Sequence, residues 1–322
     1  MLRRYLLIAL SLGSLTVASQ VSAQTYPDRP VKILQGFAPG GNADAIARAM
    51  GQEMTKGLGQ PMVVEAQAGA GGTIAATTVS KAKPDGYTLL LATGGHAVAG
   101  ALYNNLAYRT VQDFEMVSTI TYFPFLVVVP ANSKFANLSA LLATAKANPD
   151  QISYGTAGIG STHHLAGELL ASMSKTQLLH VPYRGDSGSL AALLAGDIPM
   201  IIAPPTAVMA NIKAGKLKAL ATTGPQRWSV LPDVPTVTEQ GVTGYDVRSW
   251  AGLMAPAGTP KPIIDQLNAE VQKALLVPAV KTRLEEMGGE VRGSTPEEMK
   301  TLVASQTQKW IQVVNEAKIP KQ

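Results

Sequence analysis

The chain has 322 residues, of which 46% are hydrophobic and 15% are charged. This composition is typical of a globular protein large enough for two cores, and it excludes a disordered chain. Cysteine is absent, which excludes disulfides, thiol catalysis and lipid attachment at a cysteine. The formal net charge is +5, but its lysines and arginines are scattered, so we expect no nucleic-acid partner.

The first 23 residues have the three regions of a secretory signal peptide. Arg3 and Arg4 precede an apolar stretch at 6–17, and residues 21–23 suit cleavage before Gln24. The apolar stretch is too short to span a bilayer as an anchor. We therefore predict an exported mature chain, whose formal net charge falls from +5 to +3 when the two arginines are removed.

Residues 31–58 predict a strand, a glycine turn and a helix. The strand is expected at 31–37, the turn at 39–41, and the helix continues to about Leu58, where glycine supplies a C-cap. The first N–H groups of a helix lack partners and lie at the positive end of its dipole, so the turn is a candidate anion site. Asp44 is expected to cap free amides, because a carboxylate would repel a bound anion.

The next segments alternate between strands and helices, which predicts mostly parallel sheets covered by helices on both faces. We expect strands at 61–66, 87–93, 152–155, 178–182, 199–203 and 219–223, and helices at 73–81, 138–147, 162–173, 187–194, 207–214, 262–276, 280–287 and 296–316. The β-prone stretch 114–129 is too long for one ordinary strand. We predict that 125–129 and 247–255 cross between two lobes, leaving a cleft that closes by hinging.

A second candidate anion site is the glycine-rich turn at 155–162. It nearly matches a phosphate loop, but Ser161 stands where that motif needs lysine, which argues against nucleotide hydrolysis. Backbone amides and the hydroxyls of Ser161 and Thr162 remain available to a weaker anion. The turn at 69–72 resembles a dinucleotide fingerprint, but Ile74 replaces its third glycine, so this signal is poor.

Residues 185–188 (GDSG) are similar to the nucleophile motif of serine proteases. That motif belongs to a disulfide-containing all-β protein with a histidine and a buried aspartate, whereas here it opens a predicted helix in an α/β chain. A helix cap by Asp186 or Ser187 is the simpler interpretation. The alternative is a hydrolase in which Ser187 is activated by a histidine such as His180.

The four histidines do not predict a metal site. They are His96, His163, His164 and His180. Neighbouring His163 and His164 point apart on a helix, and metal sites need three or four ligands with matched spacing. We expect one of this pair to face the cleft as a hydrogen-bonding group. No pair of carboxylates suggests general acid–base chemistry.

Several short motifs, in this order, resemble the periplasmic solute-binding proteins of tripartite tricarboxylate transporters, the TctC or Bug family. These motifs are YPDRP at 26–30, FAPGG at 37–41 with Asp44, GAGG at 69–72, PDGYTLL at 84–90, HVPYRG at 180–185, LPDVPT at 231–236, WAGL at 250–253 and APAGTP at 255–260. The resemblance implies an α/β fold of the two-lobed periplasmic-binding-protein (Venus flytrap) type with two crossover strands. We assign 24–124 and 248–295 to lobe 1, and 125–247 and 296–322 to lobe 2.

The resemblance also implies a non-enzymatic, monomeric periplasmic protein without cofactor or metal. It would capture a small carboxylated solute and deliver it to a permease with a large and a small integral-membrane subunit. Loops 37–42 and 156–162 would grip one carboxylate from opposite lobes, and the far end of the ligand would meet more variable positions. The predicted ligand-binding residues are Phe37, Ala38, Pro39, Gly40, Gly41, Asn42, His96, Thr156, Ala157, Gly158, Gly160, Ser161, Thr162, His163, Tyr183, Ala203 and Thr206.

Two departures from the family pattern bear on the ligand. Residues 203–206 (APPT) lack an aspartate that many members have, and Ala99 replaces a common asparagine. Without that acid we expect a di- or tricarboxylate, or an aromatic carboxylate, rather than an amino acid. The alternative functions are the Ser187 hydrolase and a ligand sensor for a signalling partner. The sequence does not distinguish transport from sensing, because both need the same closure.

Overall fold

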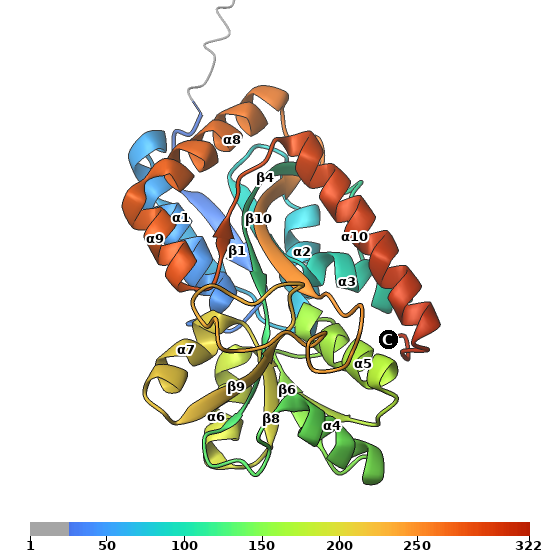
Figure 1. Cartoon of the computed structure of the whole chain (residues 1–322). Helices are drawn as coiled ribbons and strands as arrows, with labels where there is room; N and C mark the ends of the chain where they lie inside the picture. Colours follow the sequence, from blue (N-terminus) through green and yellow to red (C-terminus); the bar gives the residue numbers. More distant parts are fainter. Residues whose placement is uncertain (1–25) are drawn as a thin grey trace, which may run out of the picture.

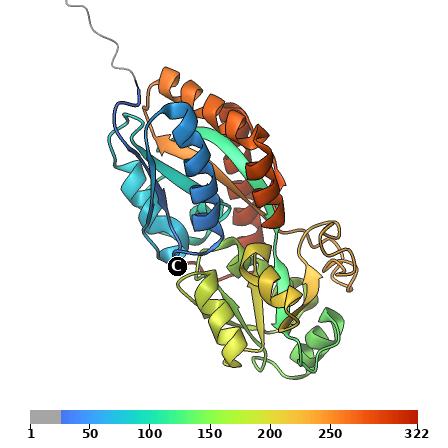
Figure 2. The same ribbon diagram turned by 90° about the vertical axis from the view of Figure 1, so that its left-hand side faces the viewer.

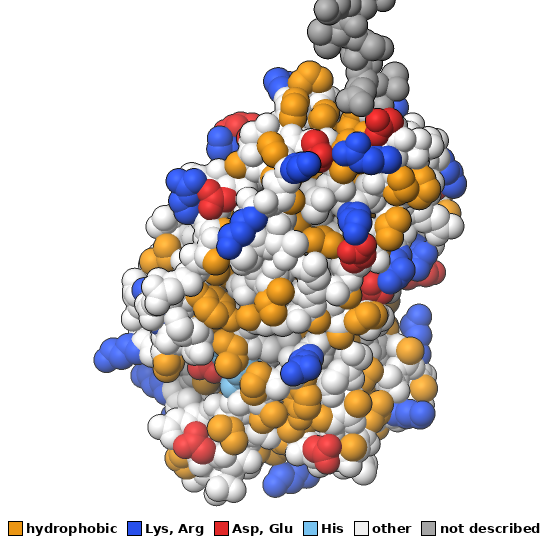
Figure 3. Space-filling view, turned by 180° about the vertical axis from the view of Figure 1, so that it is seen from behind, with side chains coloured by type: hydrophobic (Ala, Val, Ile, Leu, Met, Phe, Trp, Pro, Cys, Tyr) orange, Lys and Arg blue, Asp and Glu red, His pale blue; other side chains and the backbone are white. Residues whose placement is uncertain are grey.

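The computed structural model describes residues 26–322 as two lobes, each built on one β-sheet with helices on both faces (Figures 1 and 2). The predicted signal peptide, residues 1–23, lies outside the described residues. From residue 26 onwards, none of the helices combines the length and the apolar character that crossing a bilayer requires. On the face in Figure 3, Lys and Arg side chains are spread over both lobes.

Lobe 1 contains a six-stranded sheet. Its strands are β1 (Val31–Gln35), β2 (Met62–Ala66), β3 (Thr88–Thr93), β4 (Phe114–Pro124), β10 (Arg248–Pro256) and β11 (Glu290–Val291), in the spatial order β11-β4-β10-β3-β1-β2. β1 pairs in parallel with β2 and β3, whereas β10 runs antiparallel to β3 and β4. Successive residues of a strand point to opposite faces, so Ile33 and Leu34 enter different apolar clusters.

Helices cover both faces of this sheet. α1 (Asn42–Leu58), α8 (Lys261–Leu276) and α9 (Pro278–Glu286) pack together on one face, while α2 (Thr73–Ser80), α3 (Gly95–Leu102) and α10 (Pro296–Glu316) lie on the other, and a short 3-10 turn, η1 (Ala70–Gly72), precedes α2. α1 buries Ile46, Met50 and Met54 at helical spacing. It ends at Gly59, whose φ of 70° lets its N–H bond the carbonyl of Thr55, as a glycine C-cap requires.

Lobe 2 contains a five-stranded sheet. Its strands are β5 (Leu126–Pro130), β6 (Ser153–Thr156), β7 (Leu179–Pro182), β8 (Met200–Ala203) and β9 (Leu217–Thr222), in the order β7-β6-β8-β5-β9. Its helices are α4 (Leu138–Ala147) and α5 (Thr162–Ser174) on one face, and α6 (Asp186–Ala195) and α7 (Pro205–Lys213) on the other. Alternate valines of β5 enter the two apolar clusters, Val127 with α4 and α5 and Val128 with α6 and α7.

The chain crosses between the lobes twice. β4 ends at Pro124 in the first sheet and β5 begins at Leu126 in the second. The return passes through 223–247 to Arg248, where β10 starts. β5 and β10 run antiparallel to their neighbours, so both sheets are mixed and the prediction of mostly parallel sheets is wrong, while the two-lobed α/β fold is confirmed.

Two predictions need correction. The segment 296–322 was assigned to lobe 2, but α10 packs against α3 and β4 of lobe 1 and buries Met299, Val303 and Trp310. Its partner α3 was absent from the predicted elements, because Gly94 and Gly95 at its start suggest a loop. Without α3 the sequence offers no docking face for the last helix.

Candidate functional site

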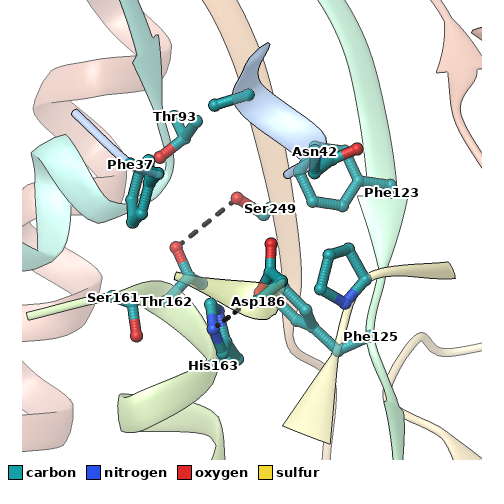
Figure 4. A pocket seen from close by; sticks show the side chains of 12 residues that line it. Phe37, Asn42, Thr93, Phe123, Phe125, Ser161, Thr162, His163, Asp186 and Ser249 are labelled. Carbon is teal, nitrogen blue, oxygen red and sulfur yellow. Dashed lines mark hydrogen bonds and ion pairs between the residues drawn. The ribbon is translucent and has the colours of Figure 1, made fainter. Parts of the chain in front are cut away.

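A small cavity lies between the lobes, where both crossings meet the starts of three helices (Figure 4). It is lined by Phe37, Asn42, Ala43, Thr93, Phe123, Phe125, Ser161, Thr162, His163, Asp186, Pro204 and Ser249. Its volume is about 30 Å³. A typical small-molecule pocket has roughly 300–1,000 Å³. The described conformation is therefore a closed cleft, and an organic ligand enters only when the lobes move apart.

Loop 1, residues 36–41, carries β1 into α1. The N-cap Gly41 has no side chain, and Asp44 instead accepts a hydrogen bond from the Gly40 N–H (3.1 Å) and one from Arg48 Nε (2.9 Å). Burial favours a higher pKa for Asp44, but these two hydrogen bonds outweigh it and lower the pKa below its usual value. Asp44 therefore pairs an amide of loop 1, but it does not pair the first amides of α1, which it was predicted to cap.

Loop 2, residues 157–161, carries β6 into α5 and is held by side chains of its own lobe. His163 Nε2 accepts the Ala157 N–H (2.7 Å), and His164 Nδ1 accepts the Gly160 N–H (3.4 Å). The N-cap Ser161 donates its hydroxyl to the Gly158 carbonyl (2.6 Å) and accepts the His164 N–H (3.3 Å). The amides of Ala157 and Gly160 are thus already paired and do not remain free for an anion.

The unpaired backbone amides follow the two loops in the chain, in the first turns of α1 and α5. Among the described residues, none accepts a hydrogen bond from the backbone N–H groups of Asn42 and Ala43, or from those of Thr162 and His163. All four residues line the cavity. Two helix N-termini from opposite lobes therefore aim unpaired donors at one enclosed space, which is the geometry of an anion site.

Several contacts across the cleft hold this arrangement. Thr206 of α7 donates its hydroxyl to Asn42 Oδ1 (3.0 Å), and Thr162 Oγ1 lies 3.4 Å from Ser249 Oγ. The backbones also meet, because a Cβ on Gly71 of lobe 1 would lie 2.6 Å from the carbonyl carbon of Gly160. Closure on this scale needs glycine at the contact.

Five of the predicted ligand-binding residues line the cavity: Phe37, Asn42, Ser161, Thr162 and His163. The remaining loop residues surround it or face elsewhere. Pro39 and Gly40 are exposed on loop 1. Ala157, Gly158 and Tyr183 line an adjoining hollow of about 410 Å³, which also lies between the lobes and shares Phe37 with the cavity. The other positions in the loops and α7 that do not line the cavity are Ala38, Gly41, Thr156, Gly160 and Thr206.

Two predicted residues do not reach the cavity at all. His96 is buried in lobe 1, stacked on Tyr108 and edge-on to Phe114, with Nε2 2.8 Å from the Thr110 carbonyl. Burial lowers the pKa of His96 to about 4, so the ring is neutral and donates to that carbonyl. Ala203 is fully buried in the core of lobe 2. His96 instead lines a small adjoining hollow together with Phe37 and Thr93, whereas Ala203 lies in the core of lobe 2.

Sequence reasoning missed seven lining residues: Ala43, Thr93, Phe123, Phe125, Asp186, Pro204 and Ser249. Phe123, Phe125 and Ser249 stand at the crossings, so the prediction of those crossings was a usable signal for them. Asp186 was expected to cap α6. Its N-cap is Gly185, and the Asp186 side chain makes no hydrogen bond to the first turn. Instead it points into the cavity (Figure 4).

A buried histidine cluster lies behind loop 2. The rings of His164 and His180 stack with centroids 4.1 Å apart, and Thr156 Oγ1 lies 2.6 Å from His180 Nε2. Burial, and then neighbouring histidines, lower the pKa of His164 to about 4 and that of His180 to about 3. Both rings are therefore neutral near pH 7 and serve as hydrogen-bonding supports for loop 2. Within residues 26–322, no three His, Asp or Glu side chains are placed to hold a metal ion.

The arrangement does not support the hydrolase alternative. Ser187 is exposed on α6, and within the described part of the chain no hydrogen bond joins it to a histidine. The proposed partner His180 is engaged by Thr156 and by stacking on His164. A nucleophilic serine needs a base within hydrogen-bonding reach.

A larger hollow of about 790 Å³ lies at the crossings, between 224–230 and 285–290, away from both helix starts.

Two α/β lobes that close on a cavity lined by two helix N-termini define a two-lobed solute-binding protein. The family model described as "Tripartite tricarboxylate transporter family receptor" matches residues 46–319. The chain belongs to this family of periplasmic solute-binding proteins.

Solved structures similar to this chain include a periplasmic binding protein and two proteins with a dicarboxylate. The periplasmic binding protein BugD is 36% identical with a TM-score of 0.89, over 92% of this chain and 100% of that one. MatC from Rhodopseudomonas palustris with bound malate is 37% identical with a TM-score of 0.86, over 90% and 100%. The R. palustris protein Rpa4515 with adipate is 32% identical with a TM-score of 0.88, over 92% and 100%.

Proposed function

We propose that this protein captures a small organic carboxylate between its lobes and delivers it to a membrane permease. The observation that carries the proposal is the pair of helix N-termini, α1 and α5, whose unpaired N–H groups face one interlobe cavity. Each N-terminus contributes about 0.3–2 kcal/mol toward a negative charge through the helix dipole. The solved relatives with malate and adipate support the same class of ligand.

In this proposal the carboxylate oxygens accept hydrogen bonds from the amides of Asn42 and Ala43 on lobe 1 and of Thr162 and His163 on lobe 2. A ligand that bonds both lobes stabilises only the closed form, so binding and closure are coupled. The cavity lining contains no Lys or Arg. The anion is therefore held by dipoles and hydrogen bonds, which suits a solute that must later be released to a permease with a large and a small membrane subunit.

A thermal-shift screen of the mature chain tests the ligand class. Each carboxylate is paired with its uncharged amide, for example succinate with succinamide and benzoate with benzamide. A carboxylate at 100 times its dissociation constant adds about 2.7 kcal/mol to the free energy of unfolding, whereas its amide adds little. If amides stabilise the protein as well as the acids do, or if no carboxylate stabilises it, the proposal is wrong.

Two proline variants test the named donors. Asn42 and Thr162 are the first residues of their helices, a position that accepts proline while losing the N–H group. The preceding residues, Gly41 and Ser161, have extended conformations compatible with a following proline. We expect Asn42→Pro and Thr162→Pro each to weaken carboxylate binding about tenfold or more. Thr162→Val is the matched control, because it removes the hydroxyl and keeps the amide. Unchanged affinity in both proline variants would contradict the assignment.

Delivery to the permease is tested separately. In proteoliposomes that contain both membrane subunits, uptake of labelled ligand is expected only when the binding protein is present outside. Uptake at the same rate without the protein would reject the transport role while leaving ligand capture intact.

A further inference from the structure

The cavity is lined by one carboxylate and by no Lys or Arg. Of its twelve lining residues, Asp186 is the only Asp, Glu, Lys or Arg. Its side chain is 8% exposed, so the carboxylate is removed from most of the water that would otherwise solvate it. The aromatic rings of Phe37, Phe123 and Phe125 form part of the same lining. A buried carboxylate in such surroundings requires hydrogen-bond donors.

The described part of the chain does not supply a donor to this carboxylate. Asp186 Oδ1 is buried without a hydrogen-bond partner. His163 Nε2 lies 3.3 Å away, but its single lone pair accepts the N–H of Ala157, so in this arrangement it has no proton to donate to the carboxylate. Asp186 therefore remains the acceptor without a donor on this wall of the cavity. A donor supplied by a ligand would satisfy it.

The unsatisfied carboxylate also lies close to the anion site on lobe 1. A Cβ built on Gly41, the residue before Asn42, would lie 3.7 Å from Asp186 Oδ2. Asn42 and Ala43 present their unpaired amides at the next two positions. A positive pole and a negative pole thus lie side by side within the closed cleft. A ligand with two carboxylates would bring one of them against Asp186 and be repelled.

We propose that Asp186 is a specificity-determining residue that binds a protonated amine, and that the ligand carries this amine next to its carboxylate, as an α-amino acid does. The proposal rests on carboxylate capture at the two helix N-termini, because it adds a second pole to that site. The ammonium group would donate to Asp186 Oδ1, while the carboxylate takes the amides of α1 and α5.

Matched ligand triplets test this pole by calorimetry on the mature protein. Each triplet shares one carbon skeleton and differs only at C2, which carries an amine, a hydroxyl or hydrogen: alanine, lactate and propionate; aspartate, malate and succinate; phenylalanine, phenyllactate and phenylpropionate. In the skeleton that binds best, we expect the amine member to bind at least tenfold more tightly than the unsubstituted acid. Equal or tighter binding of the unsubstituted acid overturns the role of Asp186 and leaves carboxylate capture standing. If no carboxylate of any skeleton binds, carboxylate capture itself fails.

Two variants test whether the preference for an amine ligand depends on Asp186. Asp186→Asn keeps the shape and removes the charge, and we expect it to weaken the amine ligand about 10- to 100-fold while strengthening or sparing the unsubstituted acid. Asp197→Asn, at an exposed position just beyond α6, is the matched control and should leave both affinities unchanged. An equal loss for all three members of a triplet would overturn the specificity role. The ranking of ligands by the wild-type protein decides the question even if Asp186→Asn does not fold.

Discussion

Loop 1 and loop 2 are both glycine turns that lead a strand into a helix, but they are held by opposite kinds of group. Loop 1 depends on a carboxylate, because Asp44 accepts the Gly40 N–H and is neutralised by Arg48. Loop 2 depends on neutral acceptors, since His163 and His164 take the amides of Ala157 and Gly160. The difference shows that a glycine turn does not by itself keep its amides free. In both loops the unpaired donors are those of the first helical turn.

The groups that hold the two loops respond differently to acid. The Asp44 carboxylate of loop 1 has a pKa lowered by its hydrogen bonds to Arg48 and Gly40, so it stays ionised to a lower pH than an ordinary aspartate. The histidines behind loop 2 have lowered pKa values in the folded state, about 4 for His164 and about 3 for His180. Loop 2 is therefore the half of the site that mild acid disturbs.

The largest expected effect comes from preventing the two lobes from meeting. Gly71→Ala places a Cβ 2.6 Å from the carbonyl carbon of Gly160, so we expect ligand affinity to fall about 10- to 100-fold. Gly59→Ala is the matched control. Gly59 has a similar φ, 70° against 63°, but a Cβ there meets nothing within 4 Å. Both variants carry the same backbone strain, and only Gly71→Ala resists closure.

Small-angle scattering with and without ligand measures closure of the lobes as a decrease in the radius of gyration. The control should contract on binding as the wild type does, and Gly71→Ala should contract less. Equal affinity in the two alanine variants would mean that the contact between Gly71 and Gly160 is absent from the ligand-bound form, and that η1 and loop 2 lie further apart there.

The second effect is acid destabilisation through loop 2. A histidine with a folded pKa below its unfolded value of about 6.5 binds fewer protons when folded, so stability is full above that value and falls as pH drops toward the folded pKa. Between pH 7 and pH 5 we expect His180 to contribute a loss of about 1–2 kcal/mol in the free energy of unfolding. Urea unfolding at both pH values measures it.

His180→Gln isolates this contribution, because it removes the titrating ring and leaves His96 and His164 in place. The variant should lose less stability than the wild type over the same pH interval, whatever its stability at pH 7. Parallel pH dependences of the two proteins would show that His180 is not buried in its neutral form behind loop 2.

The sequence predicted the local parts of this site and missed the parts that depend on packing between lobes. Strand, turn and helix start are encoded within about twenty consecutive residues, so 31–58 and 152–173 were found nearly in place. The directions of Asp186 and His96 are set by distant elements. Asp186 faces lobe 1 only because the lobes close, and His96 turns toward Tyr108 and Phe114 because both rings pack beside α3. Neither direction has a periodic signal in the chain.

The next effect concerns Ser161, the N-cap of α5 at the end of loop 2. Ser161 accepts the His164 N–H and donates to Gly158, so Ser161→Ala should lower the free energy of unfolding by about 1 kcal/mol. This loss should not vary between pH 5 and pH 7, since a hydroxyl does not titrate there. Urea unfolding of the variant checks both points, and a loss that grows at pH 5 would mean that the substitution has also exposed the histidines behind loop 2.

The smallest expected effect concerns the one side-chain hydrogen bond described here between α1 and α7. Thr206 Oγ1 donates to Asn42 Oδ1 across the cleft, and the bond exists only while the lobes are closed. Thr206→Val removes the donor at constant shape, and a net hydrogen bond is worth about 0.5–1.5 kcal/mol, so ligand affinity should fall about two- to tenfold. Thr206→Ser keeps the hydroxyl and should restore most of the affinity. The open, ligand-free form does not use this bond. Each variant should therefore change the free energy of ligand binding more than it changes the free energy of unfolding of the open protein. If Thr206→Val binds as tightly as the wild type, the ligand-bound form holds Asn42 by its own contacts, and loop 1 then acts without help from α7.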